Sequence, residues 1–221
     1  RLTRANLVLD GPGTPRLTAR AEARRRDGRW HAQAMLGLDA LPLAELARWW
    51  PEGLGTGERA WILENITAGV ARNGHWQLEA DAAGDLSDVA VTALSGTLDV
   101  ADATVHWLRP IPPVEGAQGQ VRFGLDAVEV DVSAARQAGT QVAARDALLR
   151  FTFAPGQDPA TEMRIGLAGP VPEVLGVLQH PRLRLFARRP LPLLNPQGVV
   201  EGRLDLGFPL LDALQIEQMQ I

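Results

Sequence analysis

Cysteine and lysine are both absent from this 221-residue chain, and each absence removes a class of function. Without cysteine there can be no disulfide bond, no thiolate nucleophile and no cysteine-ligated metal site. Without lysine there can be no phosphate-binding loop of the form G-x-x-x-x-G-K-[ST]. All 22 basic residues are therefore arginine. Tyrosine is also missing, although tryptophan occurs six times.

Net charge and hydropathy limit the classes of partner and location that the chain can have. The formal net charge is −4, whereas nucleic-acid binding needs a surplus of cations on one face, so we expect no nucleic-acid partner. No apolar run approaches twenty residues, and no signal-peptide pattern opens the chain. Because the chain starts without methionine, we expect it to be a piece of a longer protein, with any targeting or anchoring segment outside it.

Alternation of apolar and polar residues predicts strands along most of the chain. Two-residue turns are expected at Asp27-Gly28, Asn73-Gly74 and Asp126-Ala127. A change of phase near Ala101-Asp102 predicts a bulge or bend. The predicted strand segments are 16–38 (a hairpin), 66–80, 89–100, 103–107, 121–125, 128–132, 147–154, 161–167, 183–186 and 199–206.

Helix signals are few. Pro42 to Trp50 is predicted to be helical, with Pro51 as the stop. A second helix is expected after Thr56, which would cap it, and there Trp61, Ile62 and Ile66 share one apolar side. We treat residues 42–66 as a helical cap at one end of the sheet. A third short helix is predicted from Pro170 to Gln179.

Strands in runs with so few helices point away from a parallel α/β sheet, which needs a helix after nearly every strand. The predicted fold is mainly β: a long twisted antiparallel sheet curved into a groove, with two or three short capping helices, and residues 1–221 forming a single module. The concave face of such a sheet is where a ligand is expected.

No catalytic constellation is present in the sequence. The four histidines have no metal-ligand spacing and are interpreted as structural or surface residues, and none of the three serines lies in G-x-S-x-G. Carboxylates such as Asp99, Asp102, Glu129 and Asp131 alternate along strands, which is typical of the solvent face of a half-buried sheet. The prediction is no catalytic residue, no metal and no cofactor. Four arginines, at 24, 25, 26 and 29, surround the first turn and indicate a solvated loop tip or a contact with an anionic headgroup or partner.

Three segments resemble one family. The stretch W-P-x-G-L-G-x-G-x-R-A-W-I-L-E-N-I-T-A-G, from Trp50 to Gly69, resembles the hallmark of a domain of unknown function found in bacterial AsmA-like proteins. So do G-T-L-D-V-A-D-A-T-V-H-W-L-R-P-I-P-P-V, from Gly96 to Val114, with the G-Q-V-R-F that follows it, and the closing G-R-L-D-L-G-F-P-L-L-D-A-L-Q-I, from Gly202 to Ile216.

The resemblance implies a periplasmic protein of Gram-negative bacteria, anchored in the inner membrane by a segment outside this chain. It also implies a repeating β-groove along which phospholipid moves towards the outer membrane, with no catalytic residues. Phospholipid acyl chains are then the expected partners, with envelope proteins as a further candidate class.

The residues supply candidates for an apolar lining. Val121, Phe123 and Leu125 form one apolar alternation, and Val128, Val130 and Val132 form the next in the opposite phase. On any β domain these residues could equally be ordinary core. A structural or interaction module that supports outer-membrane protein assembly or envelope integrity is therefore the alternative function, and an enzyme acting on envelope polysaccharide is a third.

Overall fold

One antiparallel sheet dominates the computed structural model, which describes residues 5–9, 15–50, 52, 56–153, 159–183 and 194–209. Its ten strands lie in sequence order, so each inner strand pairs with the strands before and after it, and β1 and β10 form the two edges. The strands are β1 (Ala5–Leu9), β2 (Leu17–Arg26), β3 (Arg29–Pro42), β4 (Ile66–Ala82), β5 (Ala90–Val105), β6 (Val114–Gly124), β7 (Ala127–Gln137), β8 (Ala143–Thr152), β9 (Ala160–Pro170) and β10 (Val199–Pro209).

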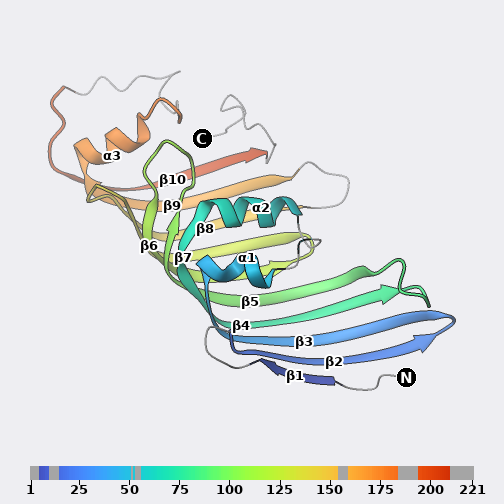
Figure 1. Ribbon diagram of the computed structural model, residues 1–221. Helices are drawn as coiled ribbons and strands as arrows, with labels where there is room; N and C mark the ends of the chain where they lie inside the picture. Colours follow the sequence, from blue (N-terminus) through green and yellow to red (C-terminus); the bar gives the residue numbers. More distant parts are fainter. Residues whose placement is uncertain are drawn as a thin grey trace.

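The sheet is open, and it twists and curves along its length (Figure 1). This confirms the predicted fold class: mainly β, antiparallel, with three short α-helices. Because consecutive strands pair directly, their connections alternate between the two ends of the strands. One end carries the connections β2–β3, β4–β5, β6–β7 and β8–β9, and it is called here the turn edge. The helices of the described residues all lie in connections at the opposite end.

Two of the three predicted turns need correction. Asp27 and Gly28 form the first turn as predicted, both with positive φ, 50° and 80°. Asn73-Gly74 is no turn, because β4 runs through it; Asn73 takes a φ of 51° within a bulge, and the pairing with β5 shifts there. The third turn is Leu125-Asp126 and not Asp126-Ala127, since Ala127 already belongs to β7. Leu125 therefore lies in the turn and outside the ladder.

The bulge predicted near Ala101-Asp102 is confirmed. Asp102 has a φ of 53°, and the pairing of β5 with β6 shifts between Val100 and Ala103. The two predicted segments on either side of it consequently form one long strand, β5. A brief strand predicted at Leu183 to Phe186 lies, beyond Leu183, outside the described residues.

The helices are short. After Pro42 a 3-10 turn, η1 (Leu43–Glu45), leads into α1 (Leu46–Trp49), then come α2 (Thr56–Asn65) and α3 (Val171–Leu178), close to the predicted bounds. The expected capping by Thr56 and the glycine-rich connection before it lie outside the described residues and side chains. The apolar side predicted for α2 is only partly present, because Ile62 is half-buried whereas Trp61 is 47% exposed.

The core is small and lies beneath η1 and α1. Leu38, Leu41 and Ala71 form its buried centre. Partly buried side chains from the helical segment and the sheet pack around it: Leu17, Leu43, Leu46, Trp49, Trp76 and Leu98. The same side of the sheet that carries Trp76 and Leu98 is therefore the side that these helices cover.

Candidate functional site

Two rows of apolar side chains cross the sheet on that side. Residues that face each other in an antiparallel pair point to the same face, so the register defines each row. The first row crosses nine strands and consists of Ala19, Leu36, Trp76, Gly96, Phe123, Val128, Phe151, Thr161 and Phe208. The second crosses six strands and consists of Leu98, Val121, Val130, Leu149, Met163 and Leu206. Together the rows are called the apolar face.

Four of the six predicted lining residues lie in these rows. Val121 pairs with Val130, and Phe123 pairs with Val128 across the β6–β7 hairpin. Val132 is opposite Gly119, one step along the same face. Leu125 differs, because it lies in the exposed two-residue turn beyond the last pair. The structure thus places five of the six predicted residues on one surface and Leu125 at its margin.

Close contact in the first row depends on Gly96. The rings of Trp76 and Phe123 lie 6.3 Å apart at their centroids with an interplanar angle of 56°. Gly96 stands between them, and a Cβ there would fall 2.5 Å from both the Cζ of Phe123 and the Cβ of Trp76. The missing side chain at residue 96 lets two aromatic rings meet across three strands.

The apolar face is partly exposed over most of its length. Except for Thr161, which is buried, every member of the two rows is half-buried. The helices pack chiefly against β4 at one end and against β9 and β10 at the other. Among the described residues, no helix packs mainly against β6 or β7, the strands that carry Val121, Phe123, Val128 and Val130.

The opposite face is charged and hydrogen-bonded. A row between the two apolar rows, but pointing the other way, carries Arg122, Glu129 and Arg150 on β6, β7 and β8. Glu129 accepts from Arg122 at 3.4 Å and lies 3.7 Å from the Nε of Arg150. Farther along, Arg164 and Asp205 pair at 3.2 Å. The sheet is therefore amphipathic, with one polar and one apolar face.

Surface carboxylates are stabilised in their charged form. Hydrogen bonds from Asn73 and Gln120 lower the pKa of Asp99. Hydrogen bonds from Ser87 lower the pKa of Asp85, and the backbone N–H of Ala83, with Arg29, lowers that of Asp88. A general acid needs a raised pKa, so these three carboxyls are shifted in the wrong direction for acid catalysis.

Each histidine has a hydrogen-bond partner of its own. Their partners are Asp81 for His31, the carbonyl of Asn73 for His75, Thr67 for His106 and the backbone N–H of Arg182 for His180. No group of three His, Asp or Glu side chains capable of holding a metal ion occurs in the described part of the chain.

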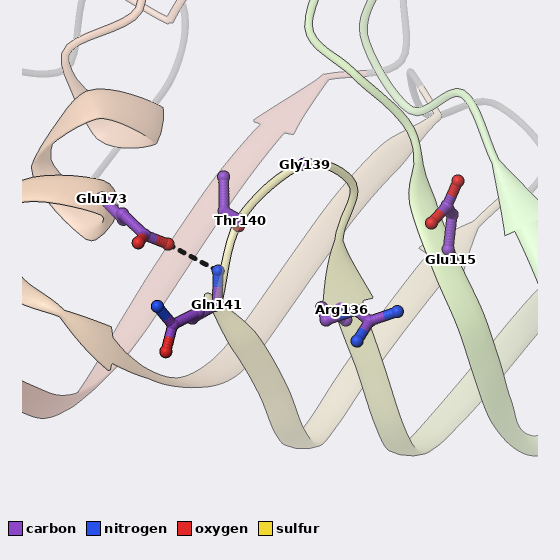
Figure 2. A pocket seen from close by; sticks show the side chains of 6 residues that line it. All are labelled: Glu115, Arg136, Gly139, Thr140, Gln141 and Glu173. Carbon is purple, nitrogen blue, oxygen red and sulfur yellow. Dashed lines mark hydrogen bonds between the residues drawn. The ribbon is translucent and has the colours of Figure 1, made fainter.

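A polar hollow of about 390 Å³ lies beside α3 (Figure 2). Its lining comprises Glu115, Arg136, Gly139, Thr140, Gln141 and Glu173. Glu173 accepts a hydrogen bond from the backbone N–H of Gln141, which ties α3 to the β7–β8 turn. Glu115 and Arg136 face each other in the ladder. Sequence reasoning gave no signal for this hollow, because its residues come from β6, β7, the β7–β8 turn and α3, which only the fold brings together.

Sequence reasoning also missed most of the apolar face. The alternation in each strand was visible, but the continuity of Leu149, Phe151, Met163 and Leu206 with the β6–β7 hairpin depends on register.

The described helices include none that is long and apolar enough to cross a bilayer. In comparisons with known proteins, no family model, no curated protein and no solved structure matches this chain.

Proposed function

We propose that this chain is a non-enzymatic module that holds phospholipid acyl chains along the apolar face of its sheet. The observation that carries the proposal is the middle of that face, where half-buried Val121, Phe123, Val128 and Val130 lie side by side on strands against which no described helix mainly packs. Apolar surface of this kind on a folded protein commonly marks a binding site.

The energetics favour such an occupant. Each methylene removed from water is worth about 0.8 kcal/mol, so a sixteen-carbon chain exposed to water costs on the order of 12 kcal/mol. A continuous apolar surface lowers that cost without specific polar contacts. Nine strands at about 4.8 Å spacing give the first row a length of about 38 Å. One bilayer leaflet contains about 15 Å of hydrocarbon, so the row is longer than the depth that an acyl chain occupies in a membrane.

The resemblance to AsmA-like proteins extends the proposal to a setting. It suggests that the module belongs to a periplasmic bridge, anchored in the inner membrane outside this segment, that carries phospholipid between the inner and outer membranes. Lipid class, periplasmic location and direction rest on that resemblance alone, whereas the capacity to hold an apolar chain rests on the sheet.

Mass spectrometry of gently purified protein tests the function, with phospholipid as the expected co-purified ligand. Val130→Lys places a charge in the middle of the apolar face and should abolish co-purification. Leu148→Lys is the matched control, because Leu148 lies on the adjacent strand, is exposed and points to the polar face. Absence of lipid from the unsubstituted protein, or equal loss in both variants, would count against the proposal.

The alternative, a structural or interaction module, predicts an apolar face covered by other elements of the chain. Helical cover reaches the Leu38–Leu41 end through η1 and α1. Nothing comparable lies over the β6–β7 hairpin among the described residues, so we favour the lipid-binding function.

A further inference from the structure

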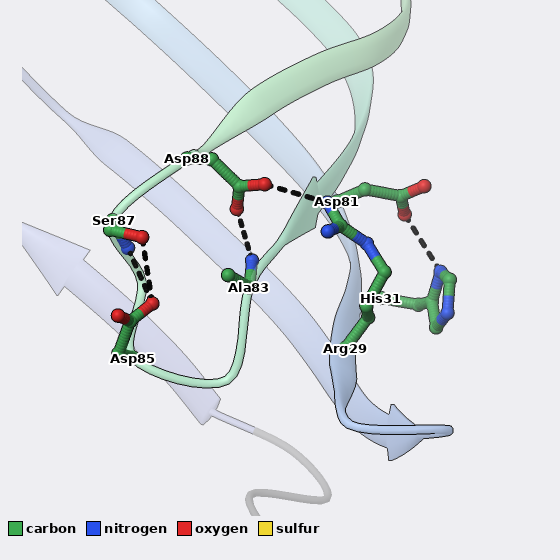
Figure 3. Close-up of polar contacts among 7 residues, drawn as sticks. All are labelled: Arg29, His31, Asp81, Ala83, Asp85, Ser87 and Asp88. Carbon is green, nitrogen blue, oxygen red and sulfur yellow. Dashed lines mark hydrogen bonds and ion pairs between the residues drawn. The ribbon is translucent and has the colours of Figure 1, made fainter.

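Two loop tips lie side by side on the turn edge of the sheet (Figure 3). One is the Asp27–Gly28 turn between β2 and β3, and the other is the 83–89 loop between β4 and β5. Arg29 joins them through an ion pair to Asp88 at 3.1 Å. Arg25 joins them as well, since its guanidinium lies against Gly84. We call residues 22–31 and 81–89 the double tip.

The 83–89 loop is held in one conformation by its own polar groups. Leu86 N–H donates to the carbonyl of Ala83 at 3.0 Å, and Ala83 N–H donates to the carboxylate of Asp88. Asp85 accepts from both the backbone N–H and the hydroxyl of Ser87. The polar groups of the loop thus bond to one another, although Asp85, Ser87 and Asp88 are all exposed.

Two aliphatic side chains of this loop are directed outward. Leu86 is 59% exposed and Val89 is 65% exposed. Leu86 also has a φ of +62°, a left-handed conformation that glycine or asparagine adopts at lower cost than leucine. Neither the turn geometry nor packing within the described structure accounts for a leucine here.

Beside the loop, the apolar face ends in an aromatic and a cation. Trp30 pairs with Ala82 at the last position of the β3–β4 ladder, and the guanidinium carbon of Arg25 lies 6.0 Å from its ring centroid. A tryptophan with an arginine beside it suits a membrane interface, where the ring lies at headgroup level and the cation reaches towards water.

The charges of the double tip are nearly balanced. It contains four arginines and five carboxylates, a formal charge of −1. Arg24 lies 3.8 Å from Glu22, and Arg26 lies 3.6 Å from Asp27, so cations and anions alternate over the surface. Such a surface suits headgroups that carry both a phosphate and an amine, and it gives no attraction to a purely anionic membrane.

We propose that the double tip docks on a bilayer of zwitterionic phospholipid, with Leu86 and Val89 inserted among the headgroups and Trp30 with Arg25 at their level. The proposal rests on the lipid-binding function, because it places the margin of the apolar face at the surface from which a lipid would leave the membrane.

Flotation with phosphatidylcholine vesicles tests the docking. The double variant Leu86→Asp, Val89→Asp should reduce the vesicle partition coefficient by at least about tenfold, since two aliphatic insertions are lost. Aspartate tolerates the left-handed backbone at residue 86, and circular dichroism verifies folding. Met35→Asp is the control, because Met35 is 50% exposed on the polar face and distant from the tip. Replacing a third of the lipid with phosphatidylglycerol should not strengthen binding.

Three results would overturn the docking: no partitioning of the unsubstituted protein, an equal loss with Met35→Asp, or binding that requires anionic lipid. Binding of a fluorescent fatty acid below its micelle concentration separates this proposal from the lipid-binding function. If the unsubstituted protein floats with vesicles but binds no fatty acid, the lipid-binding function is refuted and the docking of the double tip stands. If it binds fatty acid but does not float, the docking is refuted and the lipid-binding function stands.

Discussion

Trp76 and Phe123 come from β4 and β6, two strands that do not pair, yet their rings lie 6.3 Å apart across the glycine of the strand between them. Tilted aromatic pairs at this separation contribute about 0.5–1.5 kcal/mol beyond their burial. The pair also connects the helix-covered core around Leu38 to the uncovered part of the apolar face, because Trp76 belongs to both. Stability and the proposed ligand surface therefore share side chains.

Gly96→Val should destabilise the protein by about 1–3 kcal/mol, because new methyl groups would overlap both rings and force them apart. Urea denaturation measures the change. Gly202→Ala is the control: Gly202 also lies in a strand, but an added Cβ there meets nothing within 4 Å. Since alanine restricts the unfolded chain more than glycine does, the control should be neutral or slightly stabilising. Equal stability of Gly96→Val and the unsubstituted protein would show that the rings can separate freely.

Arg109 fixes the junction between α2 and β4. Its Nη1 donates to the side-chain oxygen of buried Asn65 at 2.6 Å, and its Nη2 donates to the carbonyl of Glu64 at 3.3 Å. Arg109→Ala leaves the Asn65 oxygen buried without a donor, which should cost about 1–3 kcal/mol in free energy of unfolding.

Arg72→Ala is the comparison for that measurement. Arg72 is an exposed arginine of β4 with no ion pair among the described residues, so its removal should change stability by less than about 0.5 kcal/mol. If the two variants unfold at the same urea concentration, the Arg109 contacts contribute nothing.

The strand pattern of this chain was predictable, and its register was not. Asn-Gly is a strong local signal for a hairpin turn, and at Asn73-Gly74 it is wrong. β3 pairs with β4 from Trp30–Ala82 to Pro42–Val70, on both sides of the dipeptide. Pairing along a strand this long outweighs the preference of two residues, and the left-handed φ of Asn73 is accommodated as a bulge. The turn preference of two residues, taken alone, does not show that pairing along the whole strand is stronger.

The candidate site was also only partly predictable, because its extent depends on strand register. Alternation predicted one apolar row from Val121 and Phe123 and another, in the opposite phase, from Val128 and Val130, and the hairpin pairs the two rows on one face. Moving the turn by one residue removed Leu125 from the ladder. The extension of the face to Leu149, Met163 and Leu206 required three further registers, none of which is encoded in any single strand.

Stability should fall in acid through Asp88, whose folded-state pKa lies below the ordinary aspartate value of about 3.9. A lowered pKa means that the stabilisation is fully present above that ordinary value and is lost as pH falls through the lower, folded value. Asp88→Asn should therefore be less stable than the unsubstituted protein at pH 6, with the difference shrinking below about pH 4. Thermal unfolding of both proteins from pH 6 to pH 2 measures it, and a difference independent of pH would contradict the assignment.

Trp61 and Ile62 are neighbours on α2, and the isoleucine is the more buried of the two. Truncating each in turn tests which side of the helix packs against the sheet. Ile62 is half-buried, so Ile62→Ala should destabilise the protein by about 1–2 kcal/mol, less than a fully buried truncation. Trp61 is nearly half exposed, and Trp61→Ala should cost under about 1 kcal/mol although more atoms are removed. Melting temperatures of the two variants decide between the orientations. A larger loss for Trp61→Ala would mean that α2 turns the tryptophan, and not the isoleucine, towards the sheet.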